Sequence, residues 1–176
     1  MFAVVTGGSG SGKSAFAEQL VLKLGEGQRI YLATMMCFDE ESRKRVKRHR
    51  EMRKDKGFVT VERYTDLSGI VLPEQGILLL ECMSNLVANE MYDPKGAGEH
   101  CVCQILDGIR MIRKQVRHLV VVTNEIFSDG LRYEEETRRY QKNLGQINRE
   151  MAKMADEVVE IVYGIPLYHK RKAEGK

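Results

Sequence analysis

The fold of this chain is decided by the stretch Gly7-Gly8-Ser9-Gly10-Ser11-Gly12-Lys13-Ser14. A strand-like apolar run at residues 2–6 precedes it, and an amphipathic helical pattern at residues 13–24 follows it, which is the setting that the phosphate-binding motif G-x-x-x-x-G-K-S requires. Backbone N–H groups of such a loop surround phosphate oxygens at a helix N-terminus. We expect Lys13 to reach the β- and γ-phosphates and Ser14 to hold Mg²⁺. A flexible Gly/Ser linker is the alternative, and the flanking strand and helix disfavour it.

Composition indicates one ordinary globular domain spanning residues 1–176. Hydrophobic residues make up 43% of the chain, and the net charge of +3 is too small to argue for nucleic acid by itself. No apolar run is long enough for a membrane span, and the first strand leads directly into the loop, so we expect no signal peptide and a cytoplasmic protein. The cysteines lack C-x-x-C spacing, and we expect free thiols at Cys37, Cys82, Cys101 and Cys103.

Apolar runs and amphipathic stretches alternate along the chain, which predicts an α/β fold with a mostly parallel central sheet between helices. Together with the loop, this favours the three-layer P-loop NTPase (RecA-like) class. The expected strands are 2–6, 29–33, 58–63, 76–80, 118–123 and 157–163. The expected helices are 13–24, 40–54, 83–90, 100–117 and 134–155. Apolar runs at 2–5, 77–80, 119–122 and 158–162 are typical of central strands buried on both faces.

Three segments are expected to be irregular. Residues 92–99 and 127–130 have the composition of exposed loops. The polar tail, His169–Lys176, is expected to fray.

A carboxylate ends one of the apolar strands, in the run Gly76-Ile77-Leu78-Leu79-Leu80-Glu81. In P-loop proteins a second acidic group stands at such a strand end, near the Mg²⁺ held by the loop. Glu81 is therefore predicted to bind the metal, directly or through water, together with Ser14. Without the loop, the same pattern is equally consistent with a carboxylate that caps the next helix.

Residues 39–56 form an unusually basic helical segment, with nine Lys or Arg between positions 43 and 56. Arg45, His49 and Arg53 are spaced to share one helix face. Basic neighbours favour the neutral form of His49, and a neutral imidazole beside arginines is suited to attack on a phosphate. A solvated basic helix with an incidental histidine remains an alternative from this segment alone. A helix that contacts nucleic acid is a weaker one, because interleaved aromatic residues are missing.

Taken together, these motifs resemble the bifunctional adenosylcobinamide kinase / adenosylcobinamide-phosphate guanylyltransferase family of cobalamin biosynthesis. The resemblance runs nearly end to end. It includes V-T-G-G-x-x-S-G-K-S at 5–14, Y-L-A-T at 31–34, R-V-x-x-H-x-x-x-R at 45–53, L-L-L-E-C at 78–82 and V-V-T-N-E at 121–125. It continues through L-G-Q-I-N at 144–148, A-D-E-V at 155–158 and G-I-P at 164–166. The phosphate loop alone names only a superfamily, whereas the histidine motif and Thr-Asn-Glu are much more specific.

The resemblance implies two reactions at one nucleotide site. One phosphorylates adenosylcobinamide with ATP or GTP, and the other transfers GMP from GTP to the new phosphate through a guanylyl-histidine, which falls by position on His49. It also implies Mg²⁺ as cofactor and a homotrimer, while the small net charge and the missing interleaved aromatic residues argue against a nucleic-acid partner. Besides the loop and Glu81, it carries nucleotide contacts over to Thr34, Met35, Met36, Arg53, Lys54 and Glu62.

The sequence departs from the family pattern in two places. The loop after Glu125 lacks the usual proline, and position 81 is Glu where many members have Asp. The residues leave open the corrinoid contacts, the choice between ATP and GTP, and whether both activities are retained. A P-loop kinase for another small molecule, without a covalent histidine, is the runner-up. A nucleic-acid-dependent ATPase is the third class.

Overall fold

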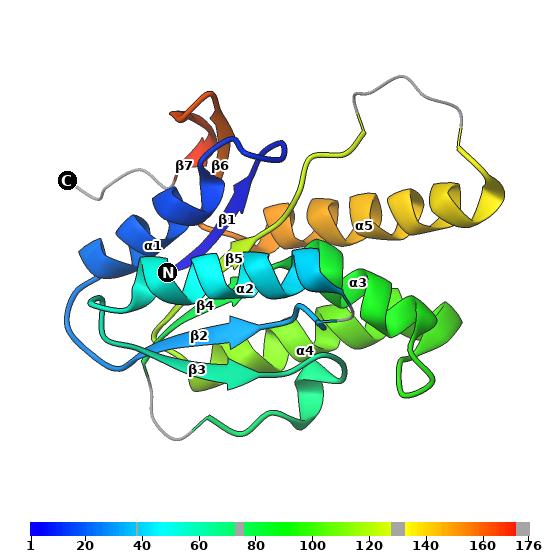
Figure 1. Ribbon diagram of the computed structural model, residues 1–176, viewed down its shortest axis with the longest axis horizontal. Helices are drawn as coiled ribbons and strands as arrows, with labels where there is room; N and C mark the ends of the chain where they lie inside the picture. Colours follow the sequence, from blue (N-terminus) through cyan, green and yellow to red (C-terminus); the bar gives the residue numbers. More distant parts are fainter. Residues whose placement is uncertain (38, 73–75, 128–132, 172–176) are drawn as a thin grey trace.

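The computed structural model describes residues 1–37, 39–72, 76–127 and 133–171. Within these ranges, seven strands form one sheet in the order β3-β2-β4-β5-β1-β6-β7 (Figure 1). All neighbours pair in parallel except β6 and β7, which are antiparallel. The strands are β1 (Phe2–Thr6), β2 (Arg29–Ala33), β3 (Phe58–Glu62), β4 (Ile77–Glu81), β5 (His118–Val122), β6 (Glu157–Val162) and β7 (Ile165–Arg171).

Helices cover both faces of the sheet and form two separate cores. Alternation along each strand directs one set of side chains to each face, so that Ala3 and Val5 pack with α1 while Phe2 and Val4 pack in the larger core. The larger core includes buried residues of α3, α4 and α5. The helices are α1 (Lys13–Lys23), α2 (Glu40–Arg53), α3 (Met83–Tyr92), α4 (Cys101–Gln115) and α5 (Glu135–Met154), with short 3₁₀ turns η1 (Leu67–Gly69) and η2 (Gly98–His100).

The topology confirms the α/β, RecA-like three-layer prediction and brings the expected site residues to one edge. One strand, β5, lies between β1, which leads into the glycine loop, and β4, which ends at Glu81. Because these strands are parallel, their carboxyl ends meet at the same edge of the sheet. The glycine loop and the Glu81 carboxylate therefore face each other although 67 residues separate Ser14 from Glu81.

The prediction of a frayed tail from His169 onward is wrong for the first residues of that tail. Residues 165–171 form β7, which pairs antiparallel with β6, and residues 172–176 lie outside the described part. The hairpin turns at Tyr163 and Gly164, whose φ angles of 50° and 80° are both positive, as a tight hairpin turn requires. Every β7 residue is exposed, so this strand has no buried apolar pattern that would predict it.

Two further expectations are corrected or left untested. The sequence predicts that β6 is buried on both faces, but its burial alternates along the strand, so that every second residue is only partly buried. Residues 92–99 are mostly irregular, although Tyr92 ends α3 and residues from Gly98 onward enter η2. In the expected loop 127–130, residues 128–130 lie outside the described part.

Two predictions about the whole chain can be compared with the structure. Among the described helices, none has the length and apolar character needed to cross a membrane. The four cysteines are free thiols, as expected.

Candidate active site

The glycine loop joins β1 to α1 and has a backbone that side chains would obstruct. Gly12 is the N-cap of α1 with φ 92°, a left-handed conformation that glycine adopts without steric cost. At Gly7, a Cβ atom would lie 2.6 Å from the carbonyl oxygen of Ile161 in β6. The loop is also held from outside, because the Gly164 N–H in the β6–β7 turn donates to the Ser11 carbonyl at 3.0 Å. The sequence did not predict this support.

The two side chains that end the motif occupy different environments. Lys13 Nζ donates to the Gly8 carbonyl at 2.9 Å, so the ammonium group lies over the loop where phosphates are expected. Burial lowers the pKa of Lys13, while nearby Cys82 and Glu81 oppose that change. Ser14 Oγ donates to Glu81 Oε1. The motif thus places an ammonium group and a hydroxyl–carboxylate pair side by side.

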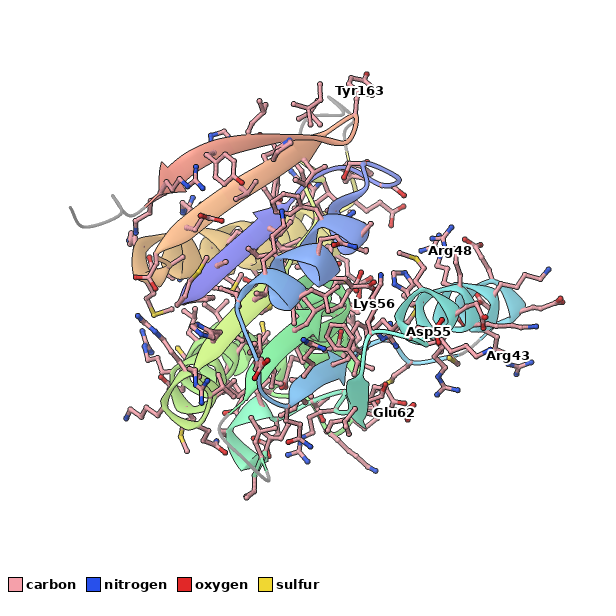
Figure 2. The ribbon with its side chains drawn as sticks, turned by 90° about the vertical axis from the view of Figure 1, so that its left-hand side faces the viewer. Arg43, Arg48, Asp55, Lys56, Glu62 and Tyr163 are labelled. Atoms are coloured by element: carbon pink, nitrogen blue, oxygen red, sulfur yellow. The ribbon has the colours of Figure 1, made fainter. Side chains whose placement is uncertain are left out.

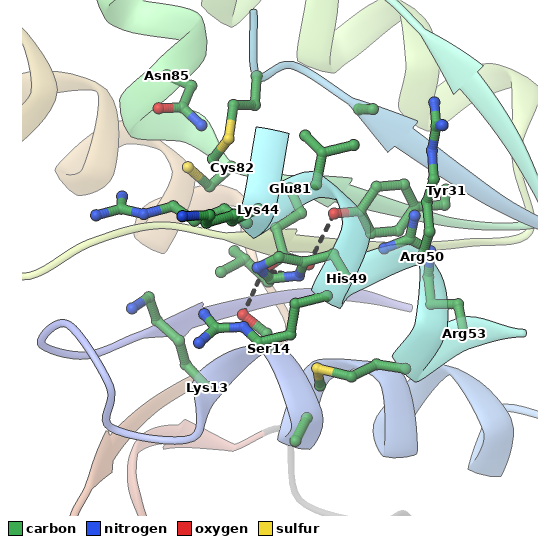
Figure 3. Close-up of a pocket in the computed structure, with 18 of the residues that line it drawn as sticks. Lys13, Ser14, Tyr31, Lys44, His49, Arg50, Arg53, Glu81, Cys82 and Asn85 are labelled. Carbon is green, nitrogen blue, oxygen red and sulfur yellow. Dashed lines mark hydrogen bonds and ion pairs between the residues drawn. The ribbon is translucent and has the colours of Figure 1, made fainter. Parts of the chain in front are cut away.

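Glu81 is the centre of the site (Figure 3). Its side chain is 8% exposed and accepts a hydrogen bond from Tyr31 through Oε2, at 3.1 Å, as well as the one from Ser14. Burial, and next the Glu81 charge, raise the pKa of Tyr31, so this hydroxyl remains a donor. The carboxylate is therefore fixed by groups from β2 and α1.

His49 lies against this carboxylate, with Nδ1 3.6 Å from Glu81 Oε1. Besides the arginines expected near His49, which line the same cavity, the imidazole thus also faces a carboxylate. Arg45 is exposed and pairs with Glu41 at 2.5 Å, whereas Arg53 is buried with its guanidinium 3.3 Å from the centre of the Tyr31 ring. The Glu41 carboxylate lies one helical turn before Arg45, and it engages the Arg45 guanidinium that was expected beside His49.

A cavity of about 810 Å³ contains these groups. The predicted site residues that line it come from the glycine loop, the end of β2, α2, β3 and β4, namely Ser9, Gly10, Ser11, Gly12, Lys13, Ser14, Met35, His49, Arg53, Glu62 and Glu81. Five predicted residues are outside this lining, namely Gly7, Gly8, Thr34, Met36 and Lys54. The structure thus brings His49 into the same cavity as the glycine loop.

The predicted residues outside the lining have other surroundings. Thr34 is buried, and its Oγ1 donates to the Cys82 carbonyl at 2.8 Å, which joins the ends of β2 and β4. Lys54 is exposed and lies 3.7 Å from Glu51. A nucleotide contact at either position stays a prediction. Glu62, which ends β3, pairs with Arg50 of α2 at 3.1 Å, and both residues line the cavity.

The donor groups at Ser14 and Glu81 fit a hard cation. A hydroxyl and a carboxylate oxygen in hydrogen-bond contact beside a phosphate loop are the oxygen ligands that Mg²⁺ takes, with phosphates and water completing its shell. Glu18, His49 and Glu81 also bring one possible ligand atom each within 4.8 Å of one another. However, Lys56 Nζ already pairs with Glu18 at 2.6 Å, so the cation next to Glu18 is the lysine.

Several lining residues were not predicted as site residues, and Tyr31, Asn85 and Cys82 are the three that bear on its chemistry. Tyr31 lies in a predicted strand and is buried in the structure, where a tyrosine hydroxyl needs a hydrogen-bond partner. Asn85, in the first turn of α3, has a buried Nδ2 without a hydrogen-bond partner among the described residues. Cys82 is also in the lining, and burial raises the pKa of its thiol, which makes it a poor nucleophile beside a histidine. Tyr31, Asn85 and Cys82 come together because of the strand order of the sheet, which the sequence does not give.

A second cavity of about 610 Å³ adjoins the first. The two share Ser9 and Asn124, and the second extends along the amino-terminal half of α5 to Tyr140 and Gln141. This places room for another molecule on the α5 side of the glycine loop.

Comparison with solved structures supports the fold. A solved ATPase domain superposes with a TM-score of 0.56 at 11% identity, covering 98% of this chain and 77% of that chain. An ATPase from the type III secretion system of pathogenic bacteria gives a TM-score of 0.54 at 10% identity, covering 90% of this chain and 50% of that one. At such identities the likeness shows a shared P-loop ATPase fold and nothing about substrates.

Comparison of sequences is more specific. The chain is 30% identical to the bifunctional adenosylcobalamin biosynthesis protein CobU of Escherichia coli (strain K12), covering 94% of this chain and 97% of that protein. It is 31% identical to the protein of the same name from Salmonella typhimurium, with the same coverage. The sequence model of the cobinamide kinase / cobinamide phosphate guanyltransferase family matches residues 3–168. The chain therefore belongs to the cobinamide kinase / cobinamide phosphate guanyltransferase family.

Proposed function

We propose that this chain phosphorylates adenosylcobinamide with ATP or GTP, and then transfers GMP from GTP to adenosylcobinamide phosphate through a guanylyl group carried on His49. The product is adenosylcobinamide-GDP. The family membership supports the pair of reactions, and the cavity supports a single nucleotide site that serves both.

For phosphoryl transfer, the glycine loop and Lys13 would bind the terminal phosphates. The hydroxyl oxygen of the aminopropanol arm attacks the γ-phosphorus and its proton passes to solvent, while the bond from that phosphorus to the β–γ bridging oxygen breaks and the nucleoside diphosphate leaves with the electron pair. Ser14 and Glu81 are the residues that would hold Mg²⁺, which neutralises phosphate charge when bound. Lys13 adds a positive charge where negative charge develops.

For guanylyl transfer, a ring nitrogen of His49 attacks the α-phosphorus of GTP. The bond from that phosphorus to the α–β bridging oxygen breaks, and pyrophosphate leaves. A phosphate oxygen of the acceptor then attacks the same phosphorus, the N–P bond breaks, and the imidazole is regenerated. Two displacements thus replace one, each with its own leaving group. The loop that binds terminal phosphates for the kinase step would hold the departing pyrophosphate here.

The observation that carries the proposal is the contact between His49 and Glu81. His49 Nδ1 lies 3.6 Å from the carboxylate oxygen that accepts the Ser14 hydrogen bond. A residue on a basic, mostly exposed helix thus stands where the glycine loop and Glu81 meet in the cavity, where an incidental histidine has no reason to be. Because Nδ1 faces Glu81, the other ring nitrogen, Nε2, is the one available for attack.

Incubation with α-labelled GTP and Mg²⁺ tests the proposal. We expect label on the protein that is labile to acid and stable to base, and that is lost in His49→Ala. His100→Ala is the matched control, because His100 is exposed in η2 and outside the cavity lining. His49→Ala is expected to retain phosphoryl transfer. Full guanylylation by His49→Ala would contradict the covalent role.

The runner-up is a P-loop small-molecule kinase without a covalent histidine, and it predicts no label on the wild-type protein under any condition. A nucleic-acid-dependent ATPase would instead bind DNA or RNA with steep salt dependence, and no such binding at low salt would exclude it. The proposal also includes a homotrimer in the cytoplasm, which rests on the family resemblance. Analytical ultracentrifugation and cell fractionation test these two points.

A further inference from the structure

Helix α2, which carries His49, is attached to the protein in an unusual way. The structure describes every residue of α2, and among them only Arg53, in the last turn, is buried. Helices of globular proteins are normally held by an apolar stripe packed on the core, and α2 lacks one. Figure 2 shows α2 extending away from the rest of the molecule. Its position must therefore be set by polar contacts.

These contacts gather at the carboxyl end of α2. The Arg53 guanidinium lies over the Tyr31 ring of β2 at 3.3 Å. Arg29 Nη1, also from β2, donates to the Lys56 carbonyl at 3.1 Å. Lys56 Nζ donates to Glu18 Oε2 of α1 at 2.6 Å, and Figure 2 places Lys56 at the inner end of the segment. The chain is thus fixed within three residues of the end of the helix.

The Lys56–Glu18 pair is the strongest of these contacts on physical grounds. Glu18 is completely buried on α1, and its Oε1 has no hydrogen-bond partner among the described residues. A buried carboxylate is costly unless a cation compensates it, so Glu18 depends on the Lys56 ammonium. Lys56 is about one quarter exposed, which makes it the member that gives way if α2 moves.

We propose that Lys56 and Glu18 form a positioning pair that sets His49 against Glu81 for guanylyl transfer. This inference rests on the proposed function. His49 lies about one turn before Arg53, so anchoring the end of α2 fixes the ring across the cavity from the glycine loop. Neither member of the pair lines the cavity, although a Glu18 carboxylate oxygen lies within 4.8 Å of ligand atoms of His49 and Glu81, so Lys56 is the member that acts through the position of α2.

The test compares Lys56→Met and the double variant Lys56→Met/Glu18→Gln with the wild-type protein. The double variant removes both charges, so it stays testable if an unpaired Glu18 prevents folding. We expect adduct formation at His49 to slow by about 10- to 100-fold, because small misplacements of a reacting group have effects of that size. Phosphoryl transfer to adenosylcobinamide should remain within about twofold. Lys56→Arg, which keeps the charge, should restore most of the adduct rate.

Lys47→Met is the matched control, an exposed lysine of α2 outside the cavity lining, and it should leave both rates unchanged. Wild-type adduct formation in the double variant would overturn the proposal. An equal fall in both reactions would also overturn it, since that indicates a general structural role.

A second measurement separates this inference from the proposed function. Hydrogen–deuterium exchange over residues 49–57 in the nucleotide-free protein needs no guanylylation, and it should rise in the double variant. Unchanged exchange would overturn the positioning pair even if His49 carries GMP. Label retained in His49→Ala would overturn the proposed function, whatever the exchange shows.

Discussion

Helices α1 and α2 lie on opposite sides of the cavity and are held in opposite ways. Helix α1 follows the glycine loop directly and buries Ala17, Glu18 and Val21 against the sheet. Helix α2 buries only Arg53 and otherwise presents charged residues to solvent. The groups expected to bind phosphates therefore adjoin a helix packed on the core, whereas the expected nucleophile is on a helix held by polar contacts at one end.

This difference matches the two tasks proposed for the site. A phosphate loop works by holding its backbone groups in place before the substrate arrives, which a packed helix achieves. The proposed nucleophile is instead held at one end of its helix, where the Lys56–Glu18 pair is proposed to set it for attack on GTP. Substitutions that affect α1 alone or α2 alone test this difference.

The largest effect is expected at the packed side, from Lys13→Ala. Both reactions should fall by at least about 100-fold, because both need the terminal phosphates held by the same ammonium group. Steady-state assays of phosphoryl and guanylyl transfer provide the measurement. Lys23→Ala, an exposed lysine in the last turn of the same helix, is the control and should leave both rates unchanged. A Lys13→Ala protein that loses one reaction and keeps the other would mean two separate nucleotide sites.

Truncating a valine should lower the free energy of unfolding more in α1 than in α2. Val21→Ala in α1 removes two fully buried methyl groups and is expected to lower the free energy of unfolding by about 2 kcal/mol. Val46→Ala, at a half-buried position of α2, should cost less than about 1 kcal/mol. Urea denaturation measures both values. Equal losses would show that α2 is packed as firmly as α1.

The smallest effect is expected at the free end of α2. Asp39 caps this helix, since its Oδ1 accepts from the Ser42 N–H at 2.7 Å, and this hydrogen bond lowers the pKa of Asp39. Asp39→Ala should raise amide exchange in the first turn of α2 and leave α1 unchanged.

The pH dependence of that cap follows from the direction of the pKa change. The folded state has the lower pKa, so the stabilisation is complete above the ordinary value of 3.8 and is lost as the pH falls through the lowered value. The difference in exchange between wild type and Asp39→Ala should therefore disappear in acid. A difference that persists there would mean that the carboxylate does not act as the cap.

The packed half of the site could be predicted from sequence because its signals are local. The glycine loop, the strand before it and the helix after it are continuous in the chain, and Glu81 ends an apolar run at a predictable edge. His49 was found through its motif, but its contact with Glu81 depends on strand order and on the Tyr31–Arg53 stacking. Those contacts join residues distant in sequence, which periodicity does not report.

The terminal hairpin and the Lys56–Glu18 pair were missed for related physical reasons. Strand β7 is exposed throughout and is held by backbone pairing to β6, which leaves no hydrophobic pattern to read. Glu18 falls on the buried face of a predicted helix, and a carboxylate at such a position indicates a partner without naming it. Here the partner is a lysine beyond the end of another helix.

The central claim is that GTP transfers its nucleotide to His49, and locating the attached group tests it most directly. The protein is incubated with GTP and Mg²⁺, digested under conditions that preserve a phosphoramidate, and its peptides are sequenced by mass spectrometry. We predict one guanylylated residue, His49, whose modification disappears when adenosylcobinamide phosphate is added. An unmodified His49 peptide in protein that still converts adenosylcobinamide phosphate to adenosylcobinamide-GDP would contradict the claim.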